Sequence, residues 1–239
     1  MFLRRYPLIK KNSASYGKIE LEDVAVSFDD KNIILKDFSL NIDKGKYVSI
    51  LGTSGIGKTT LLRAISGFKR ISSGYIRING QLASSSFSHM PPENRNLGFV
   101  FQDYALFPHL NVFENVGFGL GRKVNDRRIK IQSIIDMIDL KGHEKKYPNQ
   151  LSGGQQQRVA IGRALAISPS AILMDEPFSN LDFSLKKILS NEVKKIIRNT
   201  GTTTIMVTHD EVEAERLSDE CYFTRKWQNK TDLILSFYT

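Results

Sequence analysis

The chain has 239 residues, of which 41% are hydrophobic, so it can bury the core of one large domain. No apolar run reaches the roughly 18 residues of a membrane-spanning helix, and the basic start lacks a signal peptide's apolar run, so we expect the protein to stay in the compartment where it is made. The single cysteine, Cys221, excludes an internal disulfide, and the net charge of +9 favours an anionic partner, whether nucleic acid, a lipid surface or a phosphorylated ligand.

The first part of the chain is predicted to consist mainly of strands around one helix. "KIELEDVAVSF" (18–28) alternates between polar and apolar residues, and "YVSIL" (47–51) is a short apolar run that ends at a glycine, as buried strands do. Gly67 is predicted to end the helix, and residues 84–96, rich in Ser, Pro and Asn, are predicted to form a loop. The predicted elements are strands within 19–51, a helix over 58–68, and strands over 74–80 and 97–102.

The middle of the chain, residues 103–150, has a different character. Ile131, Ile134, Ile135 and Ile138 recur at helical spacing and share one face, and no strand is evident until residue 171. We therefore expect an inserted helical subdomain, over about residues 103–165. The remaining predicted elements are a strand over 171–176, a helix over 182–200, a strand over 202–209 and a helix over 210–218. This alternation predicts an α/β fold with a mixed, mainly parallel sheet, and the first strands form an N-terminal antiparallel β region.

A phosphate-binding loop is the strongest motif. "GTSGIGKT" fits the pattern G-x-x-x-x-G-K-[ST], and it lies between a buried strand and a helix, where the mechanism needs it. The loop's backbone N–H groups and the helix N-terminus face a polyphosphate, the lysine reaches its outer phosphates, and the threonine hydroxyl can bind Mg²⁺. The core is therefore predicted to be a P-loop NTPase. Its predicted ATP-binding residues are Gly52, Thr53, Ser54, Gly55, Ile56, Gly57, Lys58, Thr59 and Thr60.

Polar residues at the ends of three predicted strands complete this site. Asp175 ends the strand "AILMD", where it can hold Mg²⁺, and Glu176 follows it, where a general base can polarise water. His209 and Gln102 end two other strands, and each is open to either a structural or a functional interpretation. We predict Glu176, His209, Gln102 and Lys58 as catalytic residues and Thr59, Gln102 and Asp175 as residues that bind the metal.

A second glycine loop, "LSGGQ" (151–155), opens another helix. With this loop between the phosphate loop and the Asp-Glu strand, the sequence resembles the ATP-binding subunit of ABC transporters, over about residues 19–220. The resemblance implies two subunits paired head to tail around two ATP molecules, with the second loop bound to the partner's nucleotide. It assigns contacts in trans to Ser152, Gly153, Gly154, Gln155 and Asp182.

The same resemblance assigns further roles. Gln102 resembles the glutamine at the hinge to the helical subdomain, Asp182 of "SNLD" lies at the dimer seam, and His209 resembles the switch histidine. Phe28 falls where the family places a ring under adenine, although a packed core phenylalanine is the alternative. "PFSNLD" and "GGQQQRVAIGRAL" match the importer branch, which implies two membrane permease subunits, a solute-binding protein and a place on the cytoplasmic face of the inner membrane. Membrane contact is expected near residues 104–116.

Both ends of the chain depart from the family pattern. Residues 1–18 form a basic extension, and residues 221–239 form an atypical tail where importers of this type continue into a β-barrel regulatory domain. One coding string for "RKWQNKT" (225–231), read from its second base, encodes Glu-Asn-Gly-Lys-Ile-Lys, which resembles the relatives here. We hypothesise a frameshift after about Thr224, and the genomic sequence of this segment would test it. Such a frameshift predicts that the final strand pairing of the core is lost.

The resemblance predicts an ATPase that uses Mg²⁺ and powers solute import. Its motifs favour ferric iron as the solute, with polyamines, sulfate and sugars as close alternatives. A nucleic-acid-associated ATPase of the same core is the second hypothesis and has only the charge of +9 in its favour, so a nucleic-acid partner is not expected. The third hypothesis is an inactive remnant of an importer ATPase, which only the tail supports.

Overall fold

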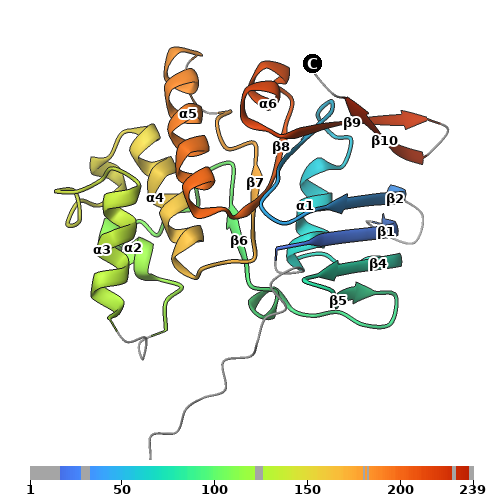
Figure 1. The fold of residues 1–239 in the computed structure, drawn as a ribbon, viewed down its shortest axis with the longest axis horizontal. Coiled ribbons are helices and arrows are strands. Elements are labelled where there is room, and N and C mark those ends of the chain that lie inside the picture. The colour runs from blue at the N-terminus through green and yellow to red at the C-terminus, as the bar shows by residue number, and fades with distance from the viewer. Residues whose placement is uncertain are drawn as a thin grey trace, which may run out of the picture.

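The fold is a two-sheet α/β arrangement, described here from a computed structural model (Figure 1). The structure describes residues 17–27, 33–121, 126–179, 181, 183–227 and 230–236. Its first sheet is antiparallel with the order β2-β1-β4-β5, and its second is mainly parallel with the order β10-β9-β3-β8-β7-β6. The first sheet contains β1 (Ile19–Ser27), β2 (Ile33–Ile42), β4 (Ser73–Ile78) and β5 (Gln81–Ser85). The second contains β3 (Tyr47–Leu51), β6 (Leu97–Val100), β7 (Ala171–Asp175), β8 (Thr203–Thr208), β9 (Glu220–Trp227) and β10 (Lys230–Ser236).

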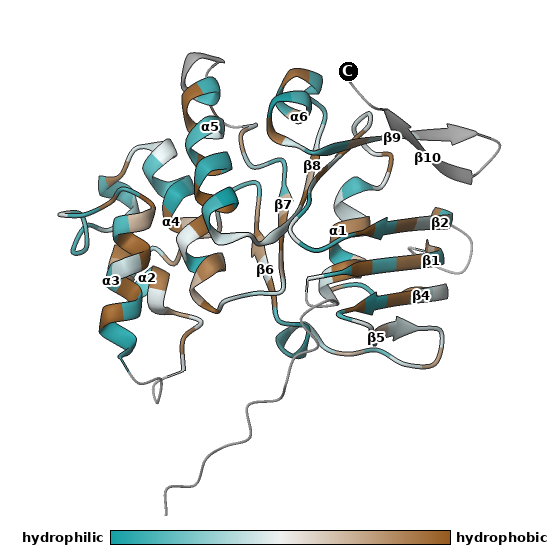
Figure 2. Cartoon of the chain, in the orientation of Figure 1, coloured by the Kyte–Doolittle hydropathy of each residue, from teal (hydrophilic) through white to brown (hydrophobic). Residues whose placement is uncertain are grey.

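Helices cover the parallel sheet because its central strands are apolar on both faces. Every residue of β3, β7 and β8 is buried, as parallel strands between two helical layers require, and β7 is largely coloured as hydrophobic in Figure 2. Helix α5 alternates between the two colours, which is the mark of one apolar face. The helices are α1 (Lys58–Ser66), α2 (Val112–Gly117), α3 (Arg127–Met137), α4 (Gly153–Ala166), α5 (Phe183–Thr200) and α6 (Glu211–Leu217), with short 3-10 turns at Pro92–Asn94 and Pro148–Gln150.

Two hydrophobic clusters hold the layers together. In the first, Leu61 and Ile65 of α1 pack between Ile50 of the parallel sheet and Ile76 of the antiparallel sheet. The second joins α2, α3, α4 and α5 to the other face of the parallel sheet, on the left of Figure 1. Helix α1 therefore lies between the two sheets, and its N-terminus is fixed from both sides.

The sequence-based elements are confirmed except in the segment 84–96. The four isoleucines predicted to share a helical face, Ile131, Ile134, Ile135 and Ile138, are all buried in the second cluster. The prediction of one loop over 84–96 is wrong in part, because β5 runs to Ser85, Ser84 forms a bridge with His89, and a 3-10 turn follows. The sequence "QLASS" shows no clear alternation, and its pairing with β4 decides its conformation.

The tail forms the final strands of the sheet, so the expected loss of strand pairing is wrong. Strand β9 pairs in parallel with β3, from Val48 opposite Glu220 to Leu51 opposite Phe223, and β10 pairs antiparallel with β9. The physical reason is that successive side chains of β9 point to opposite faces of the sheet. Cys221 packs with Leu51 and Ala214 on the α6 side, while Tyr222 packs into the cluster on the opposite face. The residues of "ECYF" thus meet the demands of a strand between two layers.

Candidate nucleotide-binding site

The phosphate loop connects β3 to α1 and bends through glycine. Gly57 precedes α1 with a φ of 109°, a left-handed conformation that side chains rarely adopt. A Cβ atom there would also lie 2.9 Å from Cγ2 of Ile34, so the position needs glycine on two grounds. The loop lines a cavity of about 320 Å³ whose walls are Ile34, Ser54, Gly55, Gly57, Lys58, Thr59, Thr60 and Glu176.

The backbone of the phosphate loop holds the side chain of Lys58 in place. Its Nζ donates to the carbonyl oxygens of Gly52 and Thr53 at 2.7 and 3.2 Å, and it lies 3.8 Å from Oε1 of Glu176. Burial lowers the pKa of Lys58, while the carboxylates of Glu176 and Asp175 act in the opposite direction. The arrangement places a fixed cation at the floor of the cavity, where it can neutralise a phosphate.

Thr59 and Asp175 come from different elements and meet beside the loop. Oγ1 of Thr59, in the first turn of α1, donates to Oδ1 of Asp175 at the end of β7 across 2.9 Å. Burial raises the pKa of Asp175, and the hydrogen bond from Thr59 opposes that shift. A hydroxyl and a carboxylate side by side form an oxygen donor set of the kind that Mg²⁺ prefers, so the residues present fit this metal.

Glu176 stands at the centre of a side-chain network. Its φ of 44° is left-handed, a strained conformation of the kind that clusters at functional sites, and its N–H donates to the carbonyl oxygen of Val207. Nδ1 of His209 lies 3.1 Å from Oε2 of Glu176. The structure therefore brings together two residues that sequence analysis placed on separate strands.

Gln102 reaches this network through a residue that sequence analysis missed. Nε2 of Gln102 donates to Oγ of Ser179 at 3.2 Å, and that hydroxyl donates to the carbonyl oxygen of Glu176 at 3.0 Å. Ser179 opens the motif "SNLD", from which sequence analysis singled out only Asp182, and it lies three residues after Glu176, where a serine hydroxyl can close a turn. Its contact with Gln102 joins residues far apart in the chain and has no local signal.

The second glycine loop lies at the start of α4 and serves first as a helix cap. Oγ of Ser152 accepts from the N–H of Gln155, and Oε1 of Gln155 accepts from the N–H of Ser152, a reciprocal capping box. Among the described residues, no hydrogen bond or ion pair joins residues 151–155 to the phosphate loop. Phe28 and Asp182, also predicted as site residues, lie outside the described residues.

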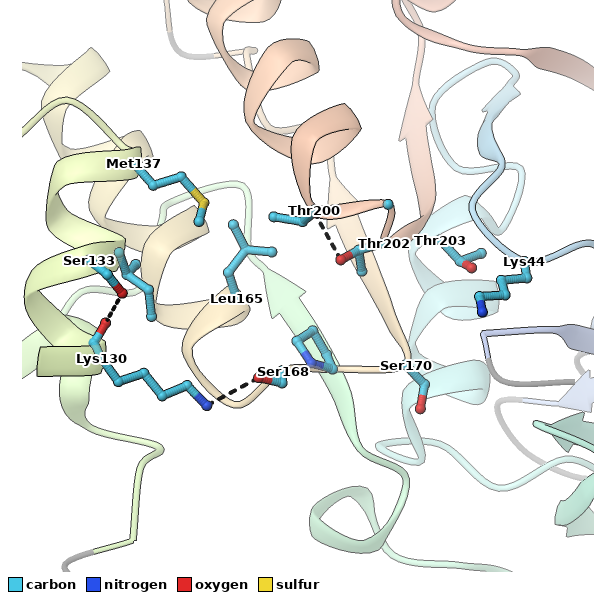
Figure 3. Close-up of a pocket in the computed structure, with 13 residues that line it drawn as sticks. Lys44, Lys130, Ser133, Met137, Leu165, Ser168, Ser170, Thr200, Thr202 and Thr203 are labelled. Atoms are coloured by element: carbon cyan, nitrogen blue, oxygen red, sulfur yellow. Dashed lines mark hydrogen bonds between the residues drawn. The ribbon is translucent and has the colours of Figure 1, made fainter. Parts of the chain in front are cut away.

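Another cavity lies near the starts of β7 and β8, while Asp175 lies at the opposite, carboxyl end of β7. Its volume is about 470 Å³, and Figure 3 shows Lys130 of α3 reaching toward Ser168, to which its Nζ donates at 3.1 Å. None of the sequence-predicted site residues lines it. The residues predicted as catalytic or metal-binding lie instead near the carboxyl ends of the parallel strands and at the start of α1, as in other open α/β sheets.

The fold and the site together define a P-loop ATPase domain. Residues 35–179 match the family described as ABC transporter, and the chain belongs to this family, of which it carries the ATPase domain. The spermidine/putrescine import ATP-binding protein PotA of Pasteurella multocida is 44% identical over 217 residues, which are 90% of this chain and 57% of that protein. PotA of Thermotoga maritima is 45% identical over 206 residues, or 85% and 55% of the two chains. The chain thus spans about half the length of these curated relatives.

Solved structures of ABC proteins are also similar to this chain. The ATP-binding cassette MJ0796, a dimer in a post-hydrolysis state bound to ADP and Pi, is 33% identical with a TM-score of 0.71, over 86% of this chain and 93% of that chain. CbiO1 of Clostridium perfringens, part of the ABC transporter complex cbiONQ, is 26% identical with a TM-score of 0.80, over 90% and 86%. In the part of the chain that the structure describes, no helix is long and apolar enough to cross a membrane.

Proposed function

We propose that this chain binds ATP with Mg²⁺ and hydrolyses it to power import through membrane subunits. One observation supports this proposal above all: Lys58, Thr59 and Glu176 line one cavity, and Asp175 and His209 contact Thr59 and Glu176 beside it. The relatives named as import ATP-binding proteins support the transport role.

In the proposed mechanism, the residues of the chain position ATP and move one proton. The loop N–H groups and Lys58 bind the phosphates, and Thr59 with Asp175 would hold Mg²⁺, which screens phosphate charge when bound. Glu176 accepts a proton from the attacking water, whose oxygen bonds to the γ-phosphorus while the bond to ADP breaks. His209 orients the Glu176 carboxylate by donating from Nδ1.

The second glycine loop supports a head-to-tail dimer. In the described part of this chain, no hydrogen bond or ion pair joins this loop to the chain's own phosphate loop, and Ser152 and Gly153 are exposed at a helix start that can face an anion. We place a second copy of the chain on it, with the partner's ATP against Ser152, Gly153 and Gln155. A Glu176→Gln variant tests this on a sizing column: a dimer only with ATP and Mg²⁺ supports the proposal, and a monomer that still binds ATP contradicts it.

Two membrane permease subunits complete the proposed assembly, and a solute-binding protein delivers the solute to them. This puts the chain on the cytoplasmic face of the inner membrane. The proposed contact lies near residues 104–116, at the start of α2 and within the proposed helical subdomain of residues 103–165. The proposed ATPase domain covers residues 19–220.

Polyamines are the solute class that the relatives support. Both PotA proteins are named for spermidine and putrescine import, whereas ferric iron, which the motifs favoured, has no support from these names. Uptake of labelled spermidine and of labelled ferric iron by cells lacking the gene distinguishes the two. Complementation with the wild-type gene, but not with Glu176→Gln, should restore spermidine uptake; restoration of iron uptake alone would overturn the polyamine proposal.

A further inference from the structure

The first turn of the phosphate loop is in contact with the tail of the chain. Strand β9 pairs with β3 as far as Leu51, which lies opposite Phe223, so Thr224 is the first residue of β9 beyond the end of β3. There, Oγ1 of Thr224 donates to the carbonyl oxygen of Leu51 across 2.8 Å. The tail therefore reaches the peptide at which the strand becomes the loop.

Thr224 also explains why residue 52 is a glycine. The φ of Gly52 is not among the left-handed values, so its backbone conformation is open to any residue. A Cβ atom on Gly52, however, would clash with Oγ1 of Thr224 and lie 3.0 Å from Cγ2 of Ile56. The requirement for glycine is thus spatial, and Thr224 of the tail contributes to it together with Ile56.

The next peptide of the chain is held by the lysine of the nucleotide site. The carbonyl oxygen of Gly52 accepts from Nζ of Lys58 at 2.7 Å, next to the carbonyl that Thr224 holds. Thr224, Leu51, Gly52 and Lys58 therefore form a continuous chain of contacts from β9 to the floor of the phosphate cavity. Movement of Thr224 would free the Leu51 carbonyl, which lies one peptide before the Gly52 carbonyl that accepts from Lys58.

We propose that Thr224 is a positioning residue of the nucleotide site, which it serves by fixing the first turn of the phosphate loop. The inference rests on the proposed ATP site and adds to it a residue from the segment that the family resemblance does not cover. It extends the ATPase domain to include Thr224 of β9.

ADP binding measured by calorimetry with Mg²⁺ tests the hydrogen bond without hydrolysis. Thr224→Val keeps the shape but removes the donor, and should weaken ADP binding about three- to tenfold, the effect of one hydrogen bond. Thr224→Ser keeps the hydroxyl and should restore wild-type affinity. Thr202→Val is the matched control, because Thr202 donates to Thr200 in a different part of the molecule, and its ADP affinity should be unchanged.

A double-mutant cycle tests the packing. Gly52→Ala should weaken ADP binding at least tenfold, and Thr224→Ala in the same chain should recover most of that loss, because it removes the clashing oxygen. Losses that simply add would overturn the inference, as would a folded Thr224→Val protein with a lower melting temperature but wild-type ADP affinity. A wild-type protein that binds no ADP would instead overturn the proposed function itself, and the inference with it.

Discussion

Nδ1 of His209 and Oε2 of Glu176 lie 3.1 Å apart, although the two residues follow different strands of the parallel sheet. A hydrogen bond to an ionised carboxylate requires the hydrogen on Nδ1, which is the tautomer that the proposed mechanism uses. The other carboxylate oxygen, Oε1, lies 3.8 Å from Nζ of Lys58. Glu176 is therefore oriented by two cationic or donor groups, one on each oxygen, which is the fixed geometry that a general base needs.

The first prediction concerns Glu176 as the proposed general base. Glu176→Gln should lower the rate of ATP hydrolysis about 10²–10⁴-fold, because an amide cannot take the proton of the attacking water. ATP binding should persist, since Lys58 and the loop N–H groups are unchanged. Single-turnover hydrolysis and equilibrium binding of ATP separate the two effects.

Glu93→Gln is the matched control for that measurement. Glu93 is an exposed residue of the 3-10 turn Pro92–Asn94 and lines no part of the phosphate cavity. Its hydrolysis rate should equal that of the wild type. If Glu176→Gln and Glu93→Gln hydrolyse ATP equally fast, Glu176 is not the base.

The second prediction follows from the buried carboxyl of Asp175. Burial raises its pKa above the ordinary 3.8, so the folded protein holds this proton more tightly than the unfolded chain does. As pH rises from the ordinary pKa of the unfolded chain to the raised pKa of the folded protein, the stability that the protonated carboxyl confers is lost. Above the raised pKa, the folded protein bears the full cost of the buried charge. Asp175→Asn should therefore raise the melting temperature at pH 7.5, measured without nucleotide, by roughly 2–4 °C for each kcal/mol of that cost.

The pH dependence of this gain distinguishes charge from packing. The difference between Asp175→Asn and the wild type should shrink as pH falls through the raised pKa of Asp175, because the wild-type carboxyl then becomes neutral as well. Asp43→Asn, at an exposed position, should show no such trend. A gain that is the same at every pH would assign the effect to packing.

Sequence analysis predicted what is local and missed what joins distant segments. The loop motif and the isoleucine spacing on α3 each fix a short stretch of chain, and the structure confirms those elements. Arg95 shows the opposite case, since its side chain donates to Ala64 and Ile65, which are some thirty residues away and give no sign of it. Tail strand β9 was likewise unpredictable, because its pairing depends on β3 and on both adjoining layers.

The third prediction separates the two glycines of the second loop. A Cβ atom on Gly154 would collide with Cδ1 of Leu189 and lie 3.0 Å from its Cδ2, and Leu189 is buried on α5. Gly154→Ala should therefore destabilise the fold by roughly 1–3 kcal/mol, the cost of overpacking. Thermal unfolding of the monomer measures it.

Gly153→Ala is the contrasting variant. Its Cβ atom would lie 3.4 Å from Cδ2 of Leu181, an ordinary contact, so stability should change by less than about 0.5 kcal/mol. If the loop binds a partner's nucleotide, however, the added methyl should weaken ATP-dependent dimerisation in a Glu176→Gln background. Unchanged dimerisation would argue against a nucleotide contact at Gly153.

The last prediction concerns Arg95, which secures the C-terminal end of α1. Its guanidinium donates to the carbonyl oxygens of Ala64, Ile65, Ala83 and Met90, and a Cβ atom on Gly67 would fall against it. Burial lowers the pKa of Arg95 to about 10, which leaves it charged at neutral pH. Arg95→Met removes the donor from several buried carbonyls at once, so it should cost at least about 3 kcal/mol.

Arg77→Met provides the comparison, because Arg77 lies at the surface of β4, 3.5 Å from an exposed Glu22, and should contribute less than about 1 kcal/mol. Denaturant unfolding of both variants measures the difference. Arg95→Lys should fall between wild type and Arg95→Met, since one ammonium cannot span carbonyls on both α1 and β5. Equal losses in Arg95→Met and Arg77→Met would show that the C-terminal end of α1 is stable without the hydrogen bonds of Arg95.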